Sequence, residues 1–337
     1  MNYSPILIPT LCRSEHFIRC IESLKKNTWA EYTDVYVALD YPAKEQHWDG
    51  YNKIRLYLEG DFSSFSSFHI IKREKNYGSA RNMKELRELV LKKYDRFIRT
   101  DDDCEFSPNF LEYMNKCLDV FENDECVMGV TGYSYPVHWH VKEECTAFKS
   151  SLIFPMWGTG FWRDKFLKME NDIEADFIGN YTRKNNLSRE SMTDARYIDC
   201  LSAATNYKNL LTKKFSDVSC GCYIQLTNRY VITPKISKVR NYGFDGSGVW
   251  CTNSLTEKKD SCKAKSYDYK KQKIDVDRYF SLVVDEKCDF QQNRDEINRF
   301  DNRSPLIIKS CEWKRMLQGI IGETLYKKLW SIKHKNG

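Results

Sequence analysis

Three consecutive carboxylates, Asp101-Asp102-Asp103, are the residues of this sequence most able to do chemistry. They follow a short strand-like segment, 96–99, and precede Ser107-Pro108, a helix-start signal with serine as the cap and proline at the first helical position. Carboxylates at the carboxyl end of a strand lie where open α/β sheets bind ligands. Carboxylate oxygens hold hard divalent cations, and such a cation can neutralise a pyrophosphate. The run therefore predicts a site for Mn²⁺ or Mg²⁺, although a bare Asp-x-Asp more often marks a solvated turn.

Strands and helices alternate through the first half of the chain, and these elements must position the acidic run. The strand-like apolar segments lie at 6–8, 35–39, 68–71, 96–99 and 127–130. Apolar residues at helical spacing follow several of them, as in Phe17, Ile21 and Leu24. This alternation predicts an α/β fold with a mostly parallel sheet and helices on both of its faces.

Composition excludes several classes of protein. The chain has 337 residues, 41% hydrophobic and 30% charged, which is typical of a soluble globular protein. The net charge of +6 is too small and too evenly spread to indicate nucleic-acid binding. No apolar run is long enough to span a bilayer, and the first strand begins too close to Met1 for a signal peptide. The 13 cysteines show no paired CxxC spacing, so we expect reduced thiols and a cytoplasmic location.

The last segment, from Trp313, has a helical apolar pattern with a basic remainder. Its apolar residues are Trp313, Met316, Leu317, Ile320, Ile321, Leu325, Leu329 and Trp330. The segment has six lysines and arginines, against Glu323 within it and Glu312 directly before it. A basic amphipathic helix of this kind can lie in a membrane interface at the inner face, or it can pack on its own domain with a solvated basic face.

Two segments of the chain resemble known glycosyltransferases. Residues 100–113, which include the acidic run, resemble the metal-binding segment of N-acetylglucosaminyltransferase I and its relatives, glycosyltransferase family 13. The opening, 5–24, is similar both to that family and to bacterial family 2 enzymes. The similarities are local motifs within residues 4–250. They imply a GT-A fold, with a catalytic domain at 1–250 and a C-terminal helical extension at 251–337.

The resemblance also implies roles for individual residues. Those it places near the nucleotide are Thr10, Arg13, Asp40, Arg81, Asn82, Asp101 and Asp102. Asp40 would accept a hydrogen bond from the uracil ring, which favours UDP donors. Asp103 would be the direct ligand of the metal. The family usually shows Glu-Asp-Asp at the run, so Asp101 is a shortened carboxylate here. Asp40 and Arg81 could instead be an ordinary turn-capping aspartate and a surface residue.

Transfer to a sugar hydroxyl needs a base, and a single acceptor-side carboxylate would give inversion at the anomeric carbon. The segment 215–218 resembles the family's aromatic-Asp-Asp-aromatic element, which makes Asp217 the predicted base. Serine at 216 and valine at 218 depart from that pattern. A helix-capping role for Asp217 remains open, and the alternative bases are Glu190, Asp194 and Asp199.

Two glycine-containing segments complete the predicted site. Trp157, Gly158 and Gly160 could form a floor under the donor and acceptor sugars, or a tight turn between core aromatics. Residues 240–248 resemble the loop that closes over the diphosphate in these enzymes, with Ser247 as a hydrogen-bond donor.

Together these features predict an inverting, metal-dependent glycosyltransferase. It would move a hexosyl or N-acetylhexosaminyl group from a UDP-sugar to a glycan or lipid-linked acceptor in surface polysaccharide synthesis. A sugar nucleotidyltransferase is an alternative, but residues 11–14 lack its glycine-rich signature loop. A non-catalytic nucleotide- or glycan-binding module of a polysaccharide assembly complex is another.

Overall fold

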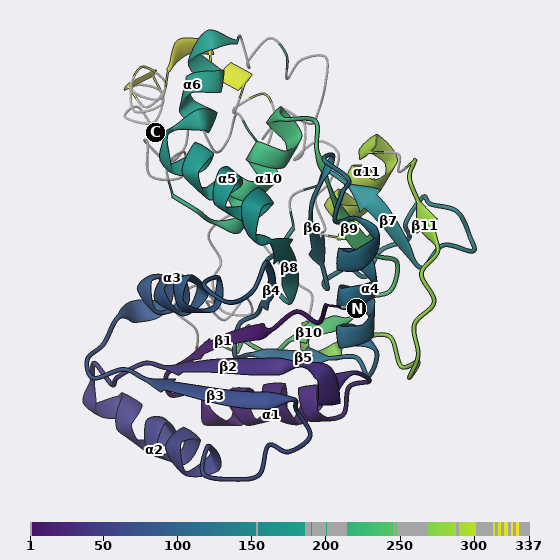
Figure 1. Cartoon of the computed structure of the whole chain (residues 1–337). Helices are drawn as coiled ribbons and strands as arrows, with labels where there is room; N and C mark the ends of the chain where they lie inside the picture. The colour runs from purple at the N-terminus through teal and green to yellow at the C-terminus, as the bar shows by residue number, and fades with distance from the viewer. Residues whose placement is uncertain are drawn as a thin grey trace.

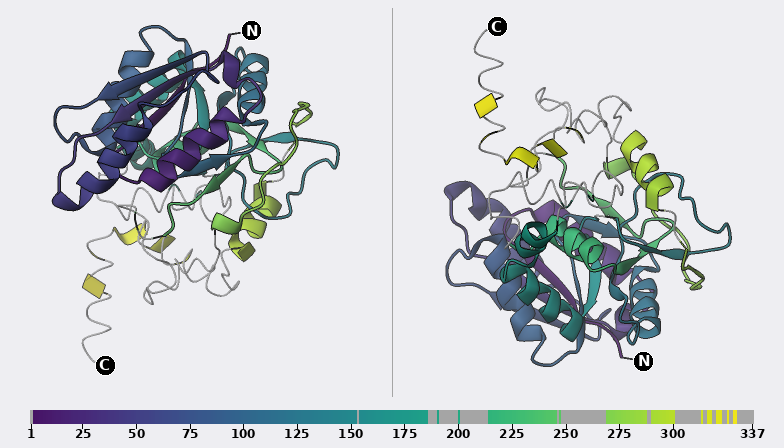
Figure 2. Two further views of the ribbon diagram at one scale, coloured as in Figure 1. Left: turned by 90° about the horizontal axis from the view of Figure 1, so that it is seen from below. Right: turned by 90° about the horizontal axis from the view of Figure 1, so that it is seen from above.

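The computed structural model describes residues 2–152, 154–185, 190, 200, 214–245, 247, 269–287 and 290–300, and nine residues of the last segment: 313, 316, 317, 320–322, 325, 328 and 329. Nine strands form one sheet in the order β11-β7-β9-β6-β8-β4-β1-β2-β3, and β5 pairs with β10 in a small second sheet (Figure 1). Helices cover both faces of the large sheet (Figure 2).

The strands are β1 (Ile6–Thr10), β2 (Asp34–Leu39), β3 (Ser67–Lys72), β4 (Arg96–Arg99), β5 (Cys104–Phe106), β6 (Val127–Thr131), β7 (Ala147–Ser150), β8 (Thr159–Trp162), β9 (Tyr230–Pro234), β10 (Val239–Asn241) and β11 (Val284–Asp285). The α-helices are α1 (Ser14–Lys25), α2 (Trp48–Tyr57), α3 (Gly78–Val90), α4 (Phe110–Val120), α5 (Arg163–Glu174), α6 (Phe177–Lys184), α10 (Asp217–Leu226) and α11 (Phe290–Phe300). Short 3₁₀ turns lie at Ala30–Tyr32, Glu45–His47 and Tyr269–Lys271.

The large sheet is mostly parallel, as the alternation of elements predicts. Within the described residues, five of its eight strand pairings are parallel, including the β4-β1-β2-β3 half. β8 enters antiparallel between β4 and β6, and β7 pairs antiparallel with β9. The predicted α/β architecture, a mostly parallel sheet flanked by helices, is therefore confirmed.

Alternate residues of β1 build two separate cores. Ile6 and Ile8 face α1, α2 and α4 in one apolar cluster, whereas Leu7 faces α3, α5 and α10 in the other. Successive side chains of a strand point to opposite faces, so a strand covered on both sides reads as a continuous apolar run. Figure 2 shows these two helical layers from below and from above.

The predicted helix start, with Ser107 as the cap and Pro108 as the first helical residue, is wrong by two residues. α4 begins at Phe110 with Asn109 at the cap position, and Ser107 and Pro108 form a turn ahead of it. The Ser107 backbone is used elsewhere, because its N–H donates to Lys238 O at 2.9 Å and its carbonyl accepts from Phe110 N at 3.1 Å. A contact from a distant strand thus moves the start of the helix.

Residues 269–300 return to the large sheet. β11 pairs with β7 at one edge, and the buried Lys238 ammonium binds the Asp275 carboxylate. α11 contributes Phe290 and Ile297 to a small cluster around Trp139. The predicted boundary at residue 250 stays a prediction, although this part of the predicted extension packs directly on the sheet.

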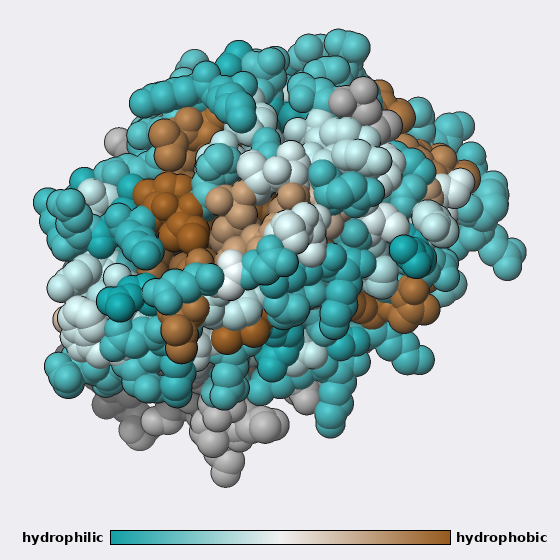
Figure 3. Space-filling model, turned by 60° about the horizontal axis from the view of Figure 1, so that its bottom comes forward, coloured by the Kyte–Doolittle hydropathy of each residue, from teal (hydrophilic) through white to brown (hydrophobic). Residues whose placement is uncertain are grey.

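The described surface is largely polar. The face in Figure 3 is mainly hydrophilic with separate hydrophobic patches. No helix in the described part of the chain is both long enough and apolar enough to cross a membrane.

Candidate active site

The acidic run lies at the carboxyl end of β4, next to the loop that joins β1 to α1. Parallel pairing of β1 with β4 puts the ends of these strands at one edge of the sheet. Thr10 Oγ1 donates to Asp102 Oδ2 at 2.8 Å. The Arg13 guanidinium spans two carboxylates: Nη1 donates to Asp103 Oδ2 at 2.7 Å and Nη2 to Asp102 Oδ1. The structure therefore brings Thr10 and Arg13, which the resemblance places near the nucleotide, into contact with the acidic run.

The carboxylates of the run are desolvated and repel one another. Desolvation raises the pKa of Asp101 and of Asp103, in spite of the opposing charges of Arg99 and Arg13. The charge of Asp103 also raises the pKa of Asp101, and the charge of Asp102 raises that of Asp103. The Asp101 side chain is still 39% exposed, so a ligand can reach it. An additional cation at this turn would stabilise the ionised forms.

The run fits a cation that is shared with a phosphate ligand. Within the described residues, no three His, Cys, Asp or Glu side chains are arranged to hold a metal by themselves. Mg²⁺ is usually held by one or two carboxylates together with substrate phosphates and water, and Mn²⁺ accepts the same oxygen ligands. Asp103 with Asp101 supplies such a partial set, but Arg13 already contacts Asp103.

The β5–β10 pair fixes the loop after β10 over the acidic run. Tyr242 N donates to Asp103 O at 2.9 Å. A Cβ added at Gly243 would lie only 2.0 Å from Asp103 Oδ2, so no larger residue fits there without a shift. Further along the loop, Asp245 Oδ2 lies 3.0 Å from His16 Nε2 at the start of α1. The loop thus covers the metal-binding candidate and contacts α1.

Ser247 is turned toward its own loop. Its N–H and hydroxyl both donate to Asp245 Oδ1, at 2.9 and 2.6 Å. Gly246 and Gly248 of the predicted closing loop lie outside the described residues. Ser247 is therefore near the acidic run through the loop, while its donors are used within the loop.

Asp40 is a fully used hydrogen-bond acceptor. Oδ1 accepts from Tyr41 N at 2.9 Å and Tyr77 N at 2.8 Å, and Oδ2 accepts from Gly78 N at 2.8 Å and Asn76 Nδ2 at 3.3 Å. The residue is only 3% exposed. These donors use both oxygens of the carboxylate, so a direct contact with a uracil ring would require one of them to leave. In this structure Asp40 holds the turn that leads into α3.

Asn82 and Arg81 differ in their surroundings. Asn82 is buried, donates from Nδ2 to Ala38 O at 2.9 Å and accepts from Arg73 Nε at 2.9 Å, so it ties α3 to β2. Arg81 lies exposed on the same helix and donates to Glu85 Oε1 at 2.8 Å. Of these two residues predicted to lie near the nucleotide, only Arg81 has a polar group that is exposed to solvent.

Asp217 is the first residue of α10 and faces the acidic run. The helix cap is Ser216, which forms a reciprocal capping box with Ser219. Asp217 is an exposed residue, and partial desolvation of its carboxyl raises its pKa. The charges of Arg99 and Asp101 also change this pKa, which puts all three groups within electrostatic reach. The alternative bases Asp194 and Asp199 lie outside the described residues.

Arg99 is a member of the site that the sequence analysis did not single out. Its Nη2 lies 3.3 Å from Asp101 Oδ1, and its charge acts on Asp217. Its Nε is buried and has no hydrogen-bond partner among the described residues. The sequence did hold a signal for Arg99: it is a basic residue at the end of the strand that precedes the acidic run.

Of the three residues predicted to lie under the sugars, Trp157 is partly exposed, whereas Gly158 and Gly160 are buried. The Trp157 ring packs edge-on against two other rings. Its centroid lies 4.8 Å from that of Tyr133 and 5.7 Å from that of Phe244, in the loop after β10. Gly158 has φ +61°, and an added Cβ there would lie 2.9 Å from Phe110. Gly160 is buried in β8 beneath α4, so its place is explained by helix–sheet packing rather than by contact with a sugar.

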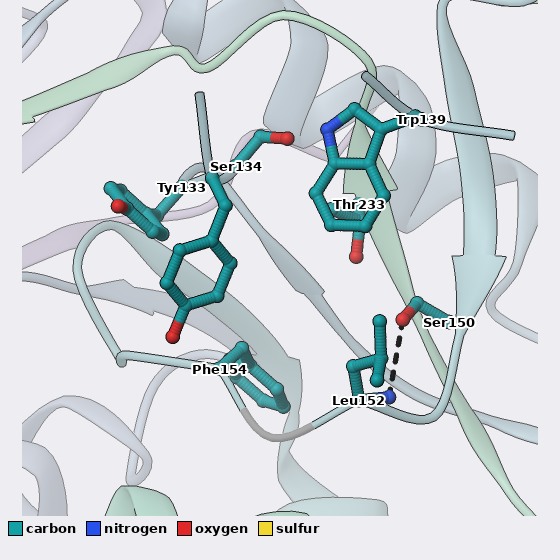
Figure 4. Close-up of a pocket in the computed structure, with 8 residues that line it drawn as sticks. Tyr133, Ser134, Trp139, Ser150, Leu152, Phe154 and Thr233 are labelled. Carbon is teal, nitrogen blue, oxygen red and sulfur yellow. Dashed lines mark hydrogen bonds between the residues drawn. The ribbon is translucent and has the colours of Figure 1, made fainter. Parts of the chain in front are cut away.

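A pocket beyond this aromatic group is too small for a sugar. Its lining residues are Tyr133, Ser134, Tyr135, Trp139, Ser150, Leu152, Phe154 and Thr233, most of them labelled in Figure 4. Leu152 N donates to Ser150 Oγ at 3.2 Å across its lower rim. Its cavity of about 10 Å³ has room for roughly one water molecule. The pocket therefore belongs to the packing of β7 and β9.

No family model and no curated protein matches this chain. Solved structures resemble part of it. They include TarS of S. aureus, at 14% identity over 51% of this chain and 30% of TarS, with a TM-score of 0.34. Residues 1–349 of TarS with UDP-GlcNAc align at 16% identity over 51% of this chain and 48% of that one (TM-score 0.34). The mannosyltransferase PcManGT of Pyrobaculum calidifontis, with GDP-Man and Mn²⁺, aligns at 13% identity over 49% and 46% (TM-score 0.36). The chain thus spans half or less of the length of each of these structures.

Proposed function

We propose that this chain is a metal-dependent glycosyltransferase of the GT-A type that uses a nucleoside diphosphate sugar as donor. One observation carries the proposal: the acidic turn lies at the carboxyl edge of a mostly parallel sheet, where Thr10 and Arg13 of the neighbouring strand–helix loop bind it and where the charge of Asp101 acts on a second carboxylate, Asp217. This is the edge at which open α/β sheets bind ligands. Arg13 and Arg99 add the positive charge that a diphosphate needs.

The proposed chemistry is a single displacement at the anomeric carbon. Asp217 takes the proton of the acceptor hydroxyl, and its raised pKa makes its ionised form a stronger base than that of an ordinary aspartate. A divalent cation held by Asp103 and Asp101 would neutralise the charge on the departing diphosphate. One base on the acceptor side, with no second nucleophile, gives inversion of configuration.

We propose UDP as the nucleotide on the basis of the resemblance at Asp40. For a direct contact with the uracil ring, Asp40 must release one of its present donors, and the 3.3 Å bond from Asn76 Nδ2 is the longest of them. Arg81, close by on α3, is exposed to meet the nucleotide. The proposed product is a surface glycan built on a glycan or lipid-linked acceptor.

Binding and hydrolysis of donors test this proposal. Calorimetry of the whole chain with UDP, GDP and dTDP, each with and without Mn²⁺, is expected to show Mn²⁺-dependent binding of UDP. Slow hydrolysis of UDP-sugars should then follow for the preferred sugar. UDP binding without any hydrolysis or transfer would support a non-catalytic binding module, and failure to bind any nucleotide would exclude both.

We further propose that the C-terminal segment contacts an anionic membrane. Met316 packs on α6 and α10. Five other apolar side chains described in this segment are 45–67% exposed: Trp313, Leu317, Ile320, Leu325 and Leu329. Exposed apolar residues interspersed with lysines and arginines fit a lipid interface better than packing on the domain itself.

Vesicle flotation tests the membrane proposal. The wild-type chain should float with vesicles of phosphatidylcholine and phosphatidylglycerol, and less so at high salt. Replacing both Leu317 and Ile320 with serine should weaken binding by roughly 100-fold, because two apolar side chains lose their burial in lipid. Leu56→Ser is the matched control, since Leu56 is an equally apolar side chain, 70% exposed on α2. Equal flotation of all three proteins would contradict the proposal.

A further inference from the structure

Arg13 occupies the position in which a cation is expected. Its guanidinium joins the carboxylates of Asp102 and Asp103, whose side chains are 6% and 8% exposed. The planar guanidinium matches two acceptors at once, and it carries its charge at every physiological pH. A group of the protein itself thus offsets part of the negative charge of the two neighbouring carboxylates.

A divalent ion at Asp103 must compete with this guanidinium. Asp103 Oδ2 accepts from Arg13 at 2.7 Å and lies against Gly243, while Oδ1 lies 3.4 Å from Asn241 Nδ2. Both oxygens are therefore engaged. Of these neighbours, the Arg13 side chain is the one that ends in a long flexible arm and is partly exposed, at 22%. It is the group that can leave most easily.

We propose that Arg13 is a resident counter-ion that the metal–nucleotide complex displaces, and that the released guanidinium then binds the donor diphosphate. This inference rests on the proposed function, because it requires a divalent cation and a diphosphate at the same turn. Arg13 is also the cap residue of α1 and makes no side-chain cap hydrogen bond there. A short swing brings its charge over the α1 N-terminus, where the unpaired N–H groups favour an anion.

Through Arg13, the affinity for the metal comes to depend on whether the nucleotide is bound. In the wild type, Mn²⁺ alone must displace Arg13 with nothing to receive the freed guanidinium. With UDP present, the diphosphate receives it, so nucleotide and metal strengthen each other's binding. Without the guanidinium, the metal should bind well by itself and gain less from the nucleotide.

Titration of the whole chain with Mn²⁺, followed by electron paramagnetic resonance of the free ion, tests this without any sugar donor. Arg13→Gln should bind Mn²⁺ alone about 10- to 100-fold more tightly than the wild type, the range expected for lost charge-assisted hydrogen bonds. Arg13→Lys should fall between the two, since lysine keeps the charge but not the fork. Arg55→Gln, an exposed site on α2, removes the same charge and should match the wild type. Equal or weaker Mn²⁺ binding by Arg13→Gln overturns the proposal.

Thermal unfolding gives a second readout. Without the guanidinium, Asp102 and Asp103 repel each other, so Arg13→Gln should melt below the wild type and gain more from added Mn²⁺. A variant that folds only with Mn²⁺ also supports the proposal, because the ion replaces the guanidinium. If Arg13→Gln folds under neither condition, Arg13→Lys decides, and a wild-type Mn²⁺ affinity for it overturns the inference. Failure of the glycosyltransferase proposal would appear separately, as no UDP binding or donor hydrolysis by the wild type.

Discussion

Replacing Asp103 with asparagine is expected to abolish Mn²⁺-dependent UDP binding and turnover together. Asparagine keeps the shape of the side chain and can still accept from Arg13, but it removes the negative charge that holds a cation. The charge stabilisation that a metal gives a departing diphosphate is worth several kcal/mol, so turnover should fall by roughly 1,000-fold or more. Calorimetry with UDP and Mn²⁺, and a donor-hydrolysis assay, measure the two effects.

The matched control for this variant is Asp49→Asn. Asp49 lies on α2 with a side chain that is 79% exposed and paired with Lys53, far in sequence from the acidic run. The control removes the same charge and should leave both UDP binding and turnover unchanged. If Asp103→Asn binds UDP with Mn²⁺ as the wild type does, Asp103 is not a metal ligand.

Replacing Asp217 with asparagine is expected to stop transfer while UDP binding is preserved. A positioned general base contributes roughly 100- to 10,000-fold to a rate, and asparagine cannot accept the proton. The base works in its ionised form, and desolvation raises the pKa of Asp217. The wild-type rate should therefore rise with pH through a pKa higher than that of an ordinary aspartate, and this limb should be missing in the variant.

Asp164→Asn is the control that separates catalysis from helix capping. Asp164 is an exposed carboxylate in the first turn of α5, as Asp217 is in α10. Asp164→Asn should lose a small amount of stability, since a first-turn carboxylate favours a helix by about 0.3–1 kcal/mol. Asp217→Asn should lose less than this, because desolvation in the folded state already disfavours the ionised Asp217 carboxyl. Only Asp217→Asn should lose transfer. If it remains fully active with the same pH profile, the base is another residue.

The elements around the site were predictable because they obey local rules. α1 buries Phe17, Ile21 and Leu24 at the predicted helical spacing. The buried runs of β1 and β2 read correctly as parallel strands covered on both faces. The resemblance implied that Thr10 and the acidic run both lie near the nucleotide, and the parallel pairing of β1 with β4 explains why they meet at one edge of the sheet.

What the sequence could not predict depends on contacts between distant segments. The start of α4 moves because Lys238 takes the N–H of Ser107. Asp40 receives donors from a turn more than thirty residues away, which changes its role from an open acceptor to a filled one. Gly160 was predicted to lie under the sugars or in a tight turn, but β8 inserts into the middle of the sheet and puts it under Met114. Periodicity carries no information about such partners.

The position of β9 has a consequence for synthesis of the protein on the ribosome. β9 lies between β6 and β7, yet it is translated after both of them. A nascent chain that has not reached Tyr230 leaves the facing edges of β6 and β7 without hydrogen-bonding partners, and open edges of this kind promote aggregation. Premature termination between residues 150 and 230 would therefore yield a fragment that already contains the acidic run. This fragment would expose two strand edges with unpaired backbone groups, to which other chains can bind.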